Sequence, residues 1–199
     1  MHIRERLPGS RLFFLSGPLT LLPVSRSPDH FALFGLPRQF AIDATALEQA
    51  YKRVQAQVHP DRFAAGTAAE RRIAMQWATQ ANEAYRALRD DTRRAAYLCE
   101  LAGVAVAAES NTAMPSAFLM QQMQWREALD EVRERGDGVA ALAAEVDAAR
   151  AATLAELHAA LDQQGEPTRA AGLVRQMMFI DRFAAELQAA TDATAAEKD

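Results

Sequence analysis

Two amphipathic stretches on either side of Pro60 constrain the fold of this chain more than any other feature. The first has apolar residues at spacings of four, three and four, as on one face of a helix, at Leu47, Tyr51, Val54 and Val58. The second has similar helical spacings, at Ile73, Trp77, Ala81, Ala84 and Leu88. Because proline breaks the hydrogen bonding of a helix interior, Pro60 should end the first helix. The pattern therefore predicts a two-helix hairpin with His59 and Asp61 on its connecting loop.

Capping signals set the expected starts of both helices. Thr45 is followed three residues later by Glu48, and Thr67 by Glu70. In this arrangement the threonine hydroxyl and the glutamate carboxylate each satisfy a free backbone N–H group at the helix start. The expected segments are a helix over 42–58, a loop over 58–66 and a helix over 67–89.

Shorter helices are expected before and after the hairpin. Asp29 and Gly35 bound a short helix, since aspartate favours a helix start and glycine a helix end. A further helix should start at the Asp90-Asp91-Thr92 segment, whose carboxylates suit the positive end of a helix, and end at Gly103. In the hairpin, we expect Trp77 and Tyr85 to be buried.

Composition favours an all-α fold. Half of the 199 residues are hydrophobic, enough for a real core, and alanine supplies much of that fraction. No stretch alternates polar and apolar residues as a strand would. The single cysteine, Cys99, excludes an internal disulfide, and with four scattered histidines it forms no zinc-site pattern. Its apolar neighbours predict a buried thiol.

Charge and hydropathy limit the classes of partner. The formal net charge is -4, and residues 115–199 hold eight basic against fifteen acidic residues. This balance argues against a nucleic-acid partner, which needs a basic surface. No apolar run has the length needed to cross a membrane.

Residues 1–28 carry no helical or strand period and are broken by prolines and glycines. Arginines precede the apolar run at 12–15, as in a signal peptide, but Gly17 and Pro18 interrupt the apolar region and no convincing cleavage site follows. We expect a disordered leader or a start site assigned too early, with export as the alternative.

From Ser116 the chain changes into three helical segments separated by two glycine-containing breaks, at 136–138 and 165–167. Short connections between long helices predict an antiparallel three-helix bundle over 116–192. Residues 104–115 have no clear period and are expected to be a linker. The expected core residues are Phe118, Trp125, Leu129, Val132, Val139, Leu142, Val146, Ala149, Leu157, Leu161, Leu173, Met177, Ile180, Ala184 and Leu187.

The first and third segments carry apolar residues outside these core stripes. At 100° per residue, Leu119, Met120 and Met123 lie about 100°, 200° and 140° away from Phe118. Phe179 points well away from the stripe of the third segment. Contiguous exposed apolar residues mark interaction surfaces, and methionine adapts its shape to a partner. From spacing alone, contact with the first domain or with a second copy of the chain is an equal alternative.

Several motifs in order resemble a known family. The tripeptide His59-Pro60-Asp61 between two helices, followed by the segment at 82–90, resembles a J domain, the module that stimulates ATP hydrolysis by DnaK-type chaperones. Three flanking motifs, at 34–37, 59–63 and 118–120, narrow the resemblance to HscB, the J-type co-chaperone of bacterial iron-sulfur cluster assembly. It extends from about Asp29 to the C-terminus. The cysteine-rich metal module of some eukaryotic relatives has no counterpart here.

The resemblance implies an all-α protein with a J domain over 29–103 and a scaffold-binding bundle over 116–192. The implied partners are a specialised DnaK-type (HscA-like) chaperone and the iron-sulfur (IscU-like) scaffold protein, in the cytoplasm. The protein would be an adaptor without cofactor or metal, not an enzyme. The implied chaperone-binding residues are Lys52, Arg53, His59, Pro60, Asp61 and Arg62. The implied scaffold-binding residues are Leu119, Met120, Met123, Arg126, Glu127 and Phe179.

Two departures and two alternatives accompany this hypothesis. Gln124 stands where the family has an acidic residue, so one polar contact to the scaffold is weakened or replaced. The helix before Pro60 has fewer basic residues than many J domains. The alternatives are a J-type co-chaperone with a different client and metal-assisted hydrolysis at His59 and Asp61. A catalytic pair would need a nucleophile or metal and a pocket that excludes water, and the sequence shows no such partners.

Overall fold

The structure is a computed structural model and describes residues 28–106, 114–135 and 137–196. These residues are helical or lie in connections, and none of them forms a strand. This confirms the predicted all-α class. Most of the predicted leader and the middle of the predicted linker lie outside the described residues.

By their contacts, the described residues divide into two compact units. The first contains residues 28–37 and 45–85, and the second contains residues 38–44 and 86–196. The functional boundaries expected at 29–103, 104–115 and 116–192 stay predictions. No helix in the described ranges is long and apolar enough to cross a membrane.

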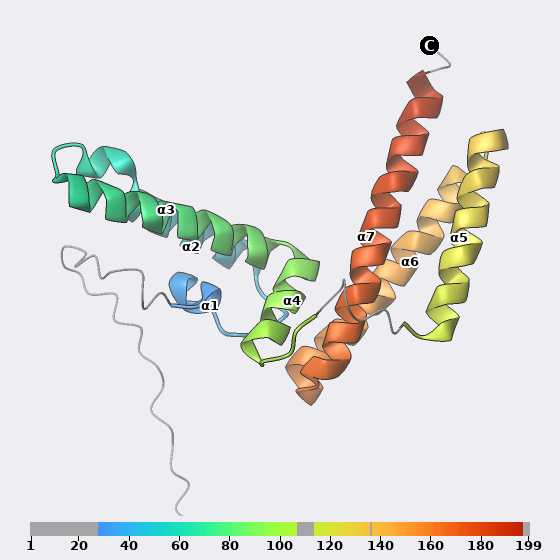
Figure 1. The fold of residues 1–199 in the computed structure, drawn as a ribbon, viewed down its shortest axis with the longest axis horizontal. Helices are drawn as coiled ribbons and strands as arrows, with labels where there is room; N and C mark the ends of the chain where they lie inside the picture. Colours follow the sequence, from blue (N-terminus) through green and yellow to red (C-terminus); the bar gives the residue numbers. More distant parts are fainter. Residues whose placement is uncertain (1–27, 107–113, 136, 197–199) are drawn as a thin grey trace, which may run out of the picture. The chain divides into compact units, whose positions relative to one another are not determined.

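The first unit is the predicted hairpin with a short helix before it (Figure 1). Its helices are α1 (His30–Phe34), α2 (Ala44–Val58) and α3 (Ala68–Arg89), and a short 3-10 helix, η2 (Pro60–Phe63), joins α2 to α3. Tyr51 links the two long helices: its ring stacks on Tyr85 at a centroid distance of 4.2 Å, and its hydroxyl donates to Asn82 at 2.8 Å. The core residues of this unit are Phe31, Leu33, Phe34, Leu47, Ala50, Val54, Val58, Ala74, Ala81 and Ala84.

The helix starts test the capping predictions. The carboxylate of Glu70 accepts from the backbone N–H of Thr67 at 2.7 Å while the Thr67 hydroxyl accepts from Glu70 N–H at 3.2 Å, so this capping box is confirmed. The box predicted at Thr45 is wrong. The helix α2 already begins at Ala44, which places Thr45 inside its first turn, and Glu48 pairs with Lys52 instead.

Two further predictions for the first unit concern the ends of α1 and the burial of two aromatic residues. Asp29 caps α1, which ends at Gly35 in the left-handed conformation (φ 69°), as predicted. Trp77 and Tyr85 were expected to be buried but are half-buried, and one face of the Tyr85 ring is covered by Tyr51.

The second unit contains the C-terminal bundle and α4 (Figure 1). Asp90 caps α4 (Asp91–Leu101), and Gly103 follows its end with φ 76°. The bundle consists of α5 (Ser116–Arg135), α6 (Val139–His158) and α7 (Pro167–Ala196), and α6 continues as a π-helical turn, η3 (Ala159–Gln164). The predicted core residues of the bundle are buried or half-buried.

Helix α4 packs against α7. Cys99 is buried in this layer, as predicted, and burial raises the pKa of its thiol to about 11.

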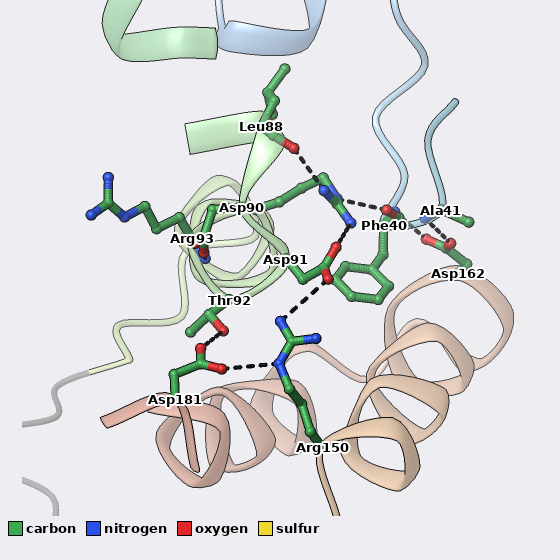
Figure 2. Close-up of polar contacts among 11 residues, drawn as sticks. Phe40, Ala41, Leu88, Asp90, Asp91, Thr92, Arg93, Arg150, Asp162 and Asp181 are labelled. Carbon is green, nitrogen blue, oxygen red and sulfur yellow. Dashed lines mark hydrogen bonds and ion pairs between the residues drawn. The ribbon is translucent and has the colours of Figure 1, made fainter. Parts of the chain in front are cut away.

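Helix α4 also carries a buried arginine with several polar contacts (Figure 2). The buried Arg94 guanidinium donates to the carbonyls of Phe40 and Leu88, each at 2.7 Å, and pairs with Asp91.

A second set of polar contacts ties α4 to the bundle helices (Figure 2). Asp181 on α7 accepts from the Thr92 hydroxyl at 2.6 Å and from Arg150 Nε at 3.1 Å. Arg150, on α6, also lies 3.7 Å from the carboxylate of Asp91. Residues of α4, α6 and α7 therefore share one network of charge-assisted hydrogen bonds.

Candidate functional site

The loop between α2 and α3 is a tight 3-10 turn. Helix α2 ends at Val58, and Pro60 occupies the first turn of η2, where the missing N–H of proline costs no hydrogen bond. The ring of His59 caps this turn, since its Nδ1 accepts from the backbone N–H of Asp61 at 3.3 Å. The carbonyl of His59 also accepts from Arg62 N–H at 3.1 Å. Local hydrogen bonds therefore fix the path of the tripeptide.

The polar side chains of this turn point into solvent. The side chain of His59 is 56% exposed and that of Asp61 is 89% exposed, with Nδ1 and Oδ2 3.5 Å apart. Because Nδ1 accepts a hydrogen bond, the proton of the neutral ring is assigned to Nε2. The turn thus offers an N–H donor and a carboxylate acceptor to a partner.

The three cations predicted beside this turn have different surroundings. The ammonium of Lys52 lies 2.6 Å from the carboxylate of Glu48, and their hydrogen bond raises the pKa of Lys52 and lowers that of Glu48. Arg53 is exposed. Arg62 is exposed and donates from Nη1 to the carbonyl of Ala56 in the last turn of α2 at 3.1 Å.

A fourth cation was missed. Arg71 on α3 donates from Nη1 to the carbonyl of Ala64, just after η2, at 3.3 Å. No periodicity or capping pattern marks Arg71, because this contact depends on how the chain leaves the 3-10 turn. The fixed turn and its cations together form a polar surface of the kind that protein partners recognise.

The apolar residues predicted on α5 are exposed. Leu119, Met120 and Met123 are 45%, 64% and 63% exposed, whereas the core ring of Phe118 is buried. Met178 on α7, which the sequence analysis did not single out, is also exposed. Several large apolar side chains exposed on one helix are typical of an interaction surface.

Phe179 differs from the expectation that it points well away from the core. It is half-buried, and its ring packs edge-on against Phe118 at 5.7 Å and stacks on Trp125 and Phe183 at 6.4 and 6.1 Å. The helical wheel of α7 alone could not show this, because the rings that cover Phe179 come mainly from α5. Phe179 is therefore a half-buried residue packed against the core of the bundle.

An ion pair marks one edge of the contact between α5 and α7. Arg133 on α5 donates to Glu186 on α7 at 2.8 Å. Residues seven apart in a helix differ by only about 20° in direction. Arg126 lies seven residues before Arg133, and Phe179 seven before Glu186, so both lie along this edge. Arg126, Glu127 and Gln124 are all exposed.

The described ranges contain no group of three or more histidine, cysteine, aspartate or glutamate side chains placed to hold a metal ion. His59 and Asp61 therefore stand as a pair of exposed polar groups on a turn.

Comparison with known proteins gives concordant results. Residues 114–188 match the family described as the HSCB C-terminal oligomerisation domain. The co-chaperone protein HscB homolog of Bordetella pertussis is 56% identical over 162 residues, which cover 81% of this chain and 95% of the relative. The homolog of Burkholderia mallei is 54% identical over 168 residues, covering 83% and 95%.

Solved structures have the same fold. The chaperone HscB from Vibrio cholerae matches with a TM-score of 0.74 and 35% identity, covering 84% of this chain and 99% of that one. The human co-chaperone protein HscB matches with a TM-score of 0.75 and 22% identity over 82% of each chain, a likeness of fold alone.

Proposed function

The chain belongs to the HscB family of co-chaperones, and we propose from this membership that it is an adaptor in iron-sulfur cluster assembly. One end binds a specialised DnaK-type (HscA-like) chaperone and stimulates its ATPase. The other end binds the iron-sulfur (IscU-like) scaffold protein and delivers it to that chaperone. The adaptor works in the cytoplasm, and the ATP site belongs to the chaperone.

The observation that carries the proposal is the turn at His59, Pro60 and Asp61. Its imidazole and carboxylate are exposed, and hydrogen bonds within the turn fix its backbone. A fixed turn loses little conformational entropy when a partner binds it. The cations Lys52, Arg53 and Arg62 beside the turn would attract an acidic chaperone surface and raise the rate of encounter.

The scaffold-binding end is proposed at the surface formed by Leu119, Met120 and Met123 on α5 with Phe179 on α7. The first three are exposed, and Phe179 is supported by packing on Phe118 and Trp125. Exposed methionines suit an apolar protein partner, because their flexible side chains adapt to its shape. Arg126 and Glu127 would supply polar contacts at the rim of this surface.

A binding experiment tests the scaffold-binding end. We expect the full chain to bind the scaffold protein in isothermal titration calorimetry and Met120→Asp with Met123→Asp to abolish that binding. Phe179 is left unchanged because its substitution would disturb the packing of Phe118 and Trp125. Met75→Asp is the matched control, since Met75 is 61% exposed but lies on α3 in the other unit.

Equal binding by the Met120→Asp, Met123→Asp variant and the wild type would refute this surface. If the wild type failed to bind the scaffold yet stimulated the chaperone, the protein would instead be a J-type co-chaperone for a different client.

A further inference from the structure

Lys52 is the only one of the three predicted chaperone-contact cations whose charge is matched within the described residues. Its ammonium forms a 2.6 Å ion pair with Glu48 one helical turn earlier, and both groups are exposed. Lys52 attracts an approaching acidic surface, but the neighbouring Glu48 repels that surface and partly cancels the attraction. The pair therefore contributes less net positive potential beside the turn than an unpaired cation would.

Arg62 on the turn and Arg71 on α3 form no ion pair with another described residue. Arg62 is bonded to the carbonyl of Ala56, and Arg71 to the carbonyl of Ala64. A carbonyl is neutral, so each hydrogen bond orients the guanidinium and leaves its full charge. Within the described ranges neither arginine forms an ion pair. The two anchoring carbonyls lie on either side of the His59-Pro60-Asp61 tripeptide in the chain.

Glu70, which precedes Arg71 in the sequence, accepts hydrogen bonds from Thr67. Both the N–H and the hydroxyl of Thr67 donate to Oε2 of Glu70, at 2.7 and 2.9 Å. These hydrogen bonds hold the pKa of Glu70 below its usual value and keep its carboxylate at the start of α3. Glu70 keeps its negative charge there, and within the described residues it forms no ion pair with Arg71.

From this geometry we infer that Arg71 is a chaperone-contact residue, and that its contribution to binding exceeds that of Lys52. The inference rests on the proposed function. The partner surface that fits two arginines is an acidic patch of the chaperone. Its carboxylates would contact Arg71 and Arg62 while the tripeptide is bound. Arginine suits this contact because its planar guanidinium can bind a carboxylate with two parallel N–H groups.

The experiment measures the single-turnover ATPase rate of the purified DnaK-type chaperone against the concentration of the full-length chain. Arg71→Gln is expected to raise the concentration needed for half-maximal stimulation by about two- to fivefold, as expected for one exposed ion pair. Arg71→Lys should recover part of this loss because it keeps the charge. The difference between wild type and Arg71→Gln should shrink at raised salt, since salt screens exposed charges.

Two comparison variants sharpen the test. Arg72→Gln removes another exposed arginine from the next position of α3 and should have less than half the effect of Arg71→Gln. Glu48→Gln with Lys52→Gln removes one charge of each sign, and it too should have a smaller effect than Arg71→Gln. Circular dichroism should show the same helicity for all variants.

The outcomes separate this inference from the proposed function. If the wild-type chain does not stimulate the chaperone, the proposed function fails and the inference with it. If the wild type stimulates but Arg71→Gln matches it, or the loss does not depend on salt, the inference alone is overturned. A loss equal to that of the paired Glu48 and Lys52 variant would likewise overturn it.

Discussion

Asp162 accepts a hydrogen bond of 2.6 Å from the backbone N–H of Phe40, 122 residues earlier in the chain. Its second oxygen accepts from the N–H of Ala41 at 2.8 Å, so one carboxylate holds two consecutive amides of the segment before α2 (Figure 2). Asp162 lies in the π-helical turn η3, and such turns occur frequently at functional positions. The continuation of α6 as this turn thus carries the carboxylate that binds the segment at residues 38–44.

Removal of this carboxylate should destabilise the second unit. Asp162→Ala leaves the amides of Phe40 and Ala41 without their acceptor, which we expect to lower the free energy of unfolding by about 1–3 kcal/mol. Urea denaturation followed by circular dichroism measures the change. Asp147→Ala, which removes an exposed carboxylate from α6, should change stability by less than about 0.5 kcal/mol. Equal effects of the two variants would contradict the role given to Asp162.

The neighbouring residues Arg93 and Arg94 of α4 allow the stabilising effect of a buried arginine to be compared with that of an exposed one. Arg94 is buried and bonded to two carbonyls and to Asp91, whereas Arg93 is exposed and its side chain points away from these contacts (Figure 2). Arg94→Ala should cost about 3–5 kcal/mol, because it leaves the carbonyls and the carboxylate without their partner. Arg93→Ala should cost less than about 0.5 kcal/mol. Unfolding curves of similar midpoint for both variants would show that the Arg94 contacts do not stabilise the unit.

The capping box of α3 gives a pH-dependent expectation. Hydrogen bonds from Thr67 lower the pKa of Glu70, so the stabilisation is present above the usual glutamate pKa and is lost as the pH falls through the lowered value. Thr67→Ala should return the pKa of Glu70 toward its ordinary value, as measured by NMR titration of the side-chain carboxyl carbon. An unchanged pKa in this variant would mean that the threonine does not hold the carboxylate in solution.

Local signals in the sequence were sufficient for most helices. Periodicity identified the buried faces, and residues such as Asp90 and Thr67 marked helix starts because a cap acts on its own first turn. The π-helical turn at Asp162 and the contact of Arg94 with Phe40 could not be predicted, since their partners lie far away in the chain.

At the candidate site, too, features set by local sequence could be predicted, whereas those set by the path of the chain could not. The tripeptide and the methionines of α5 follow from motif and spacing, and the side chains of His59, Asp61, Met120 and Met123 are exposed. The pairing of Lys52 with Glu48 could have been read from their spacing of four residues, which favours such pairs on a helix. Arg71 could not be found in this way, because its link to the turn depends on the path of residues 60–66.

The most direct test of the central claim is the ATPase rate of the purified DnaK-type chaperone with the wild-type chain and with His59→Gln. Because the His59 side chain is exposed and its hydrogen bond among the described residues is local to the turn, the substitution should leave the helical circular dichroism unchanged. We expect the wild type to stimulate the rate and His59→Gln to abolish that stimulation. Equal stimulation by a folded His59→Gln variant would contradict the account.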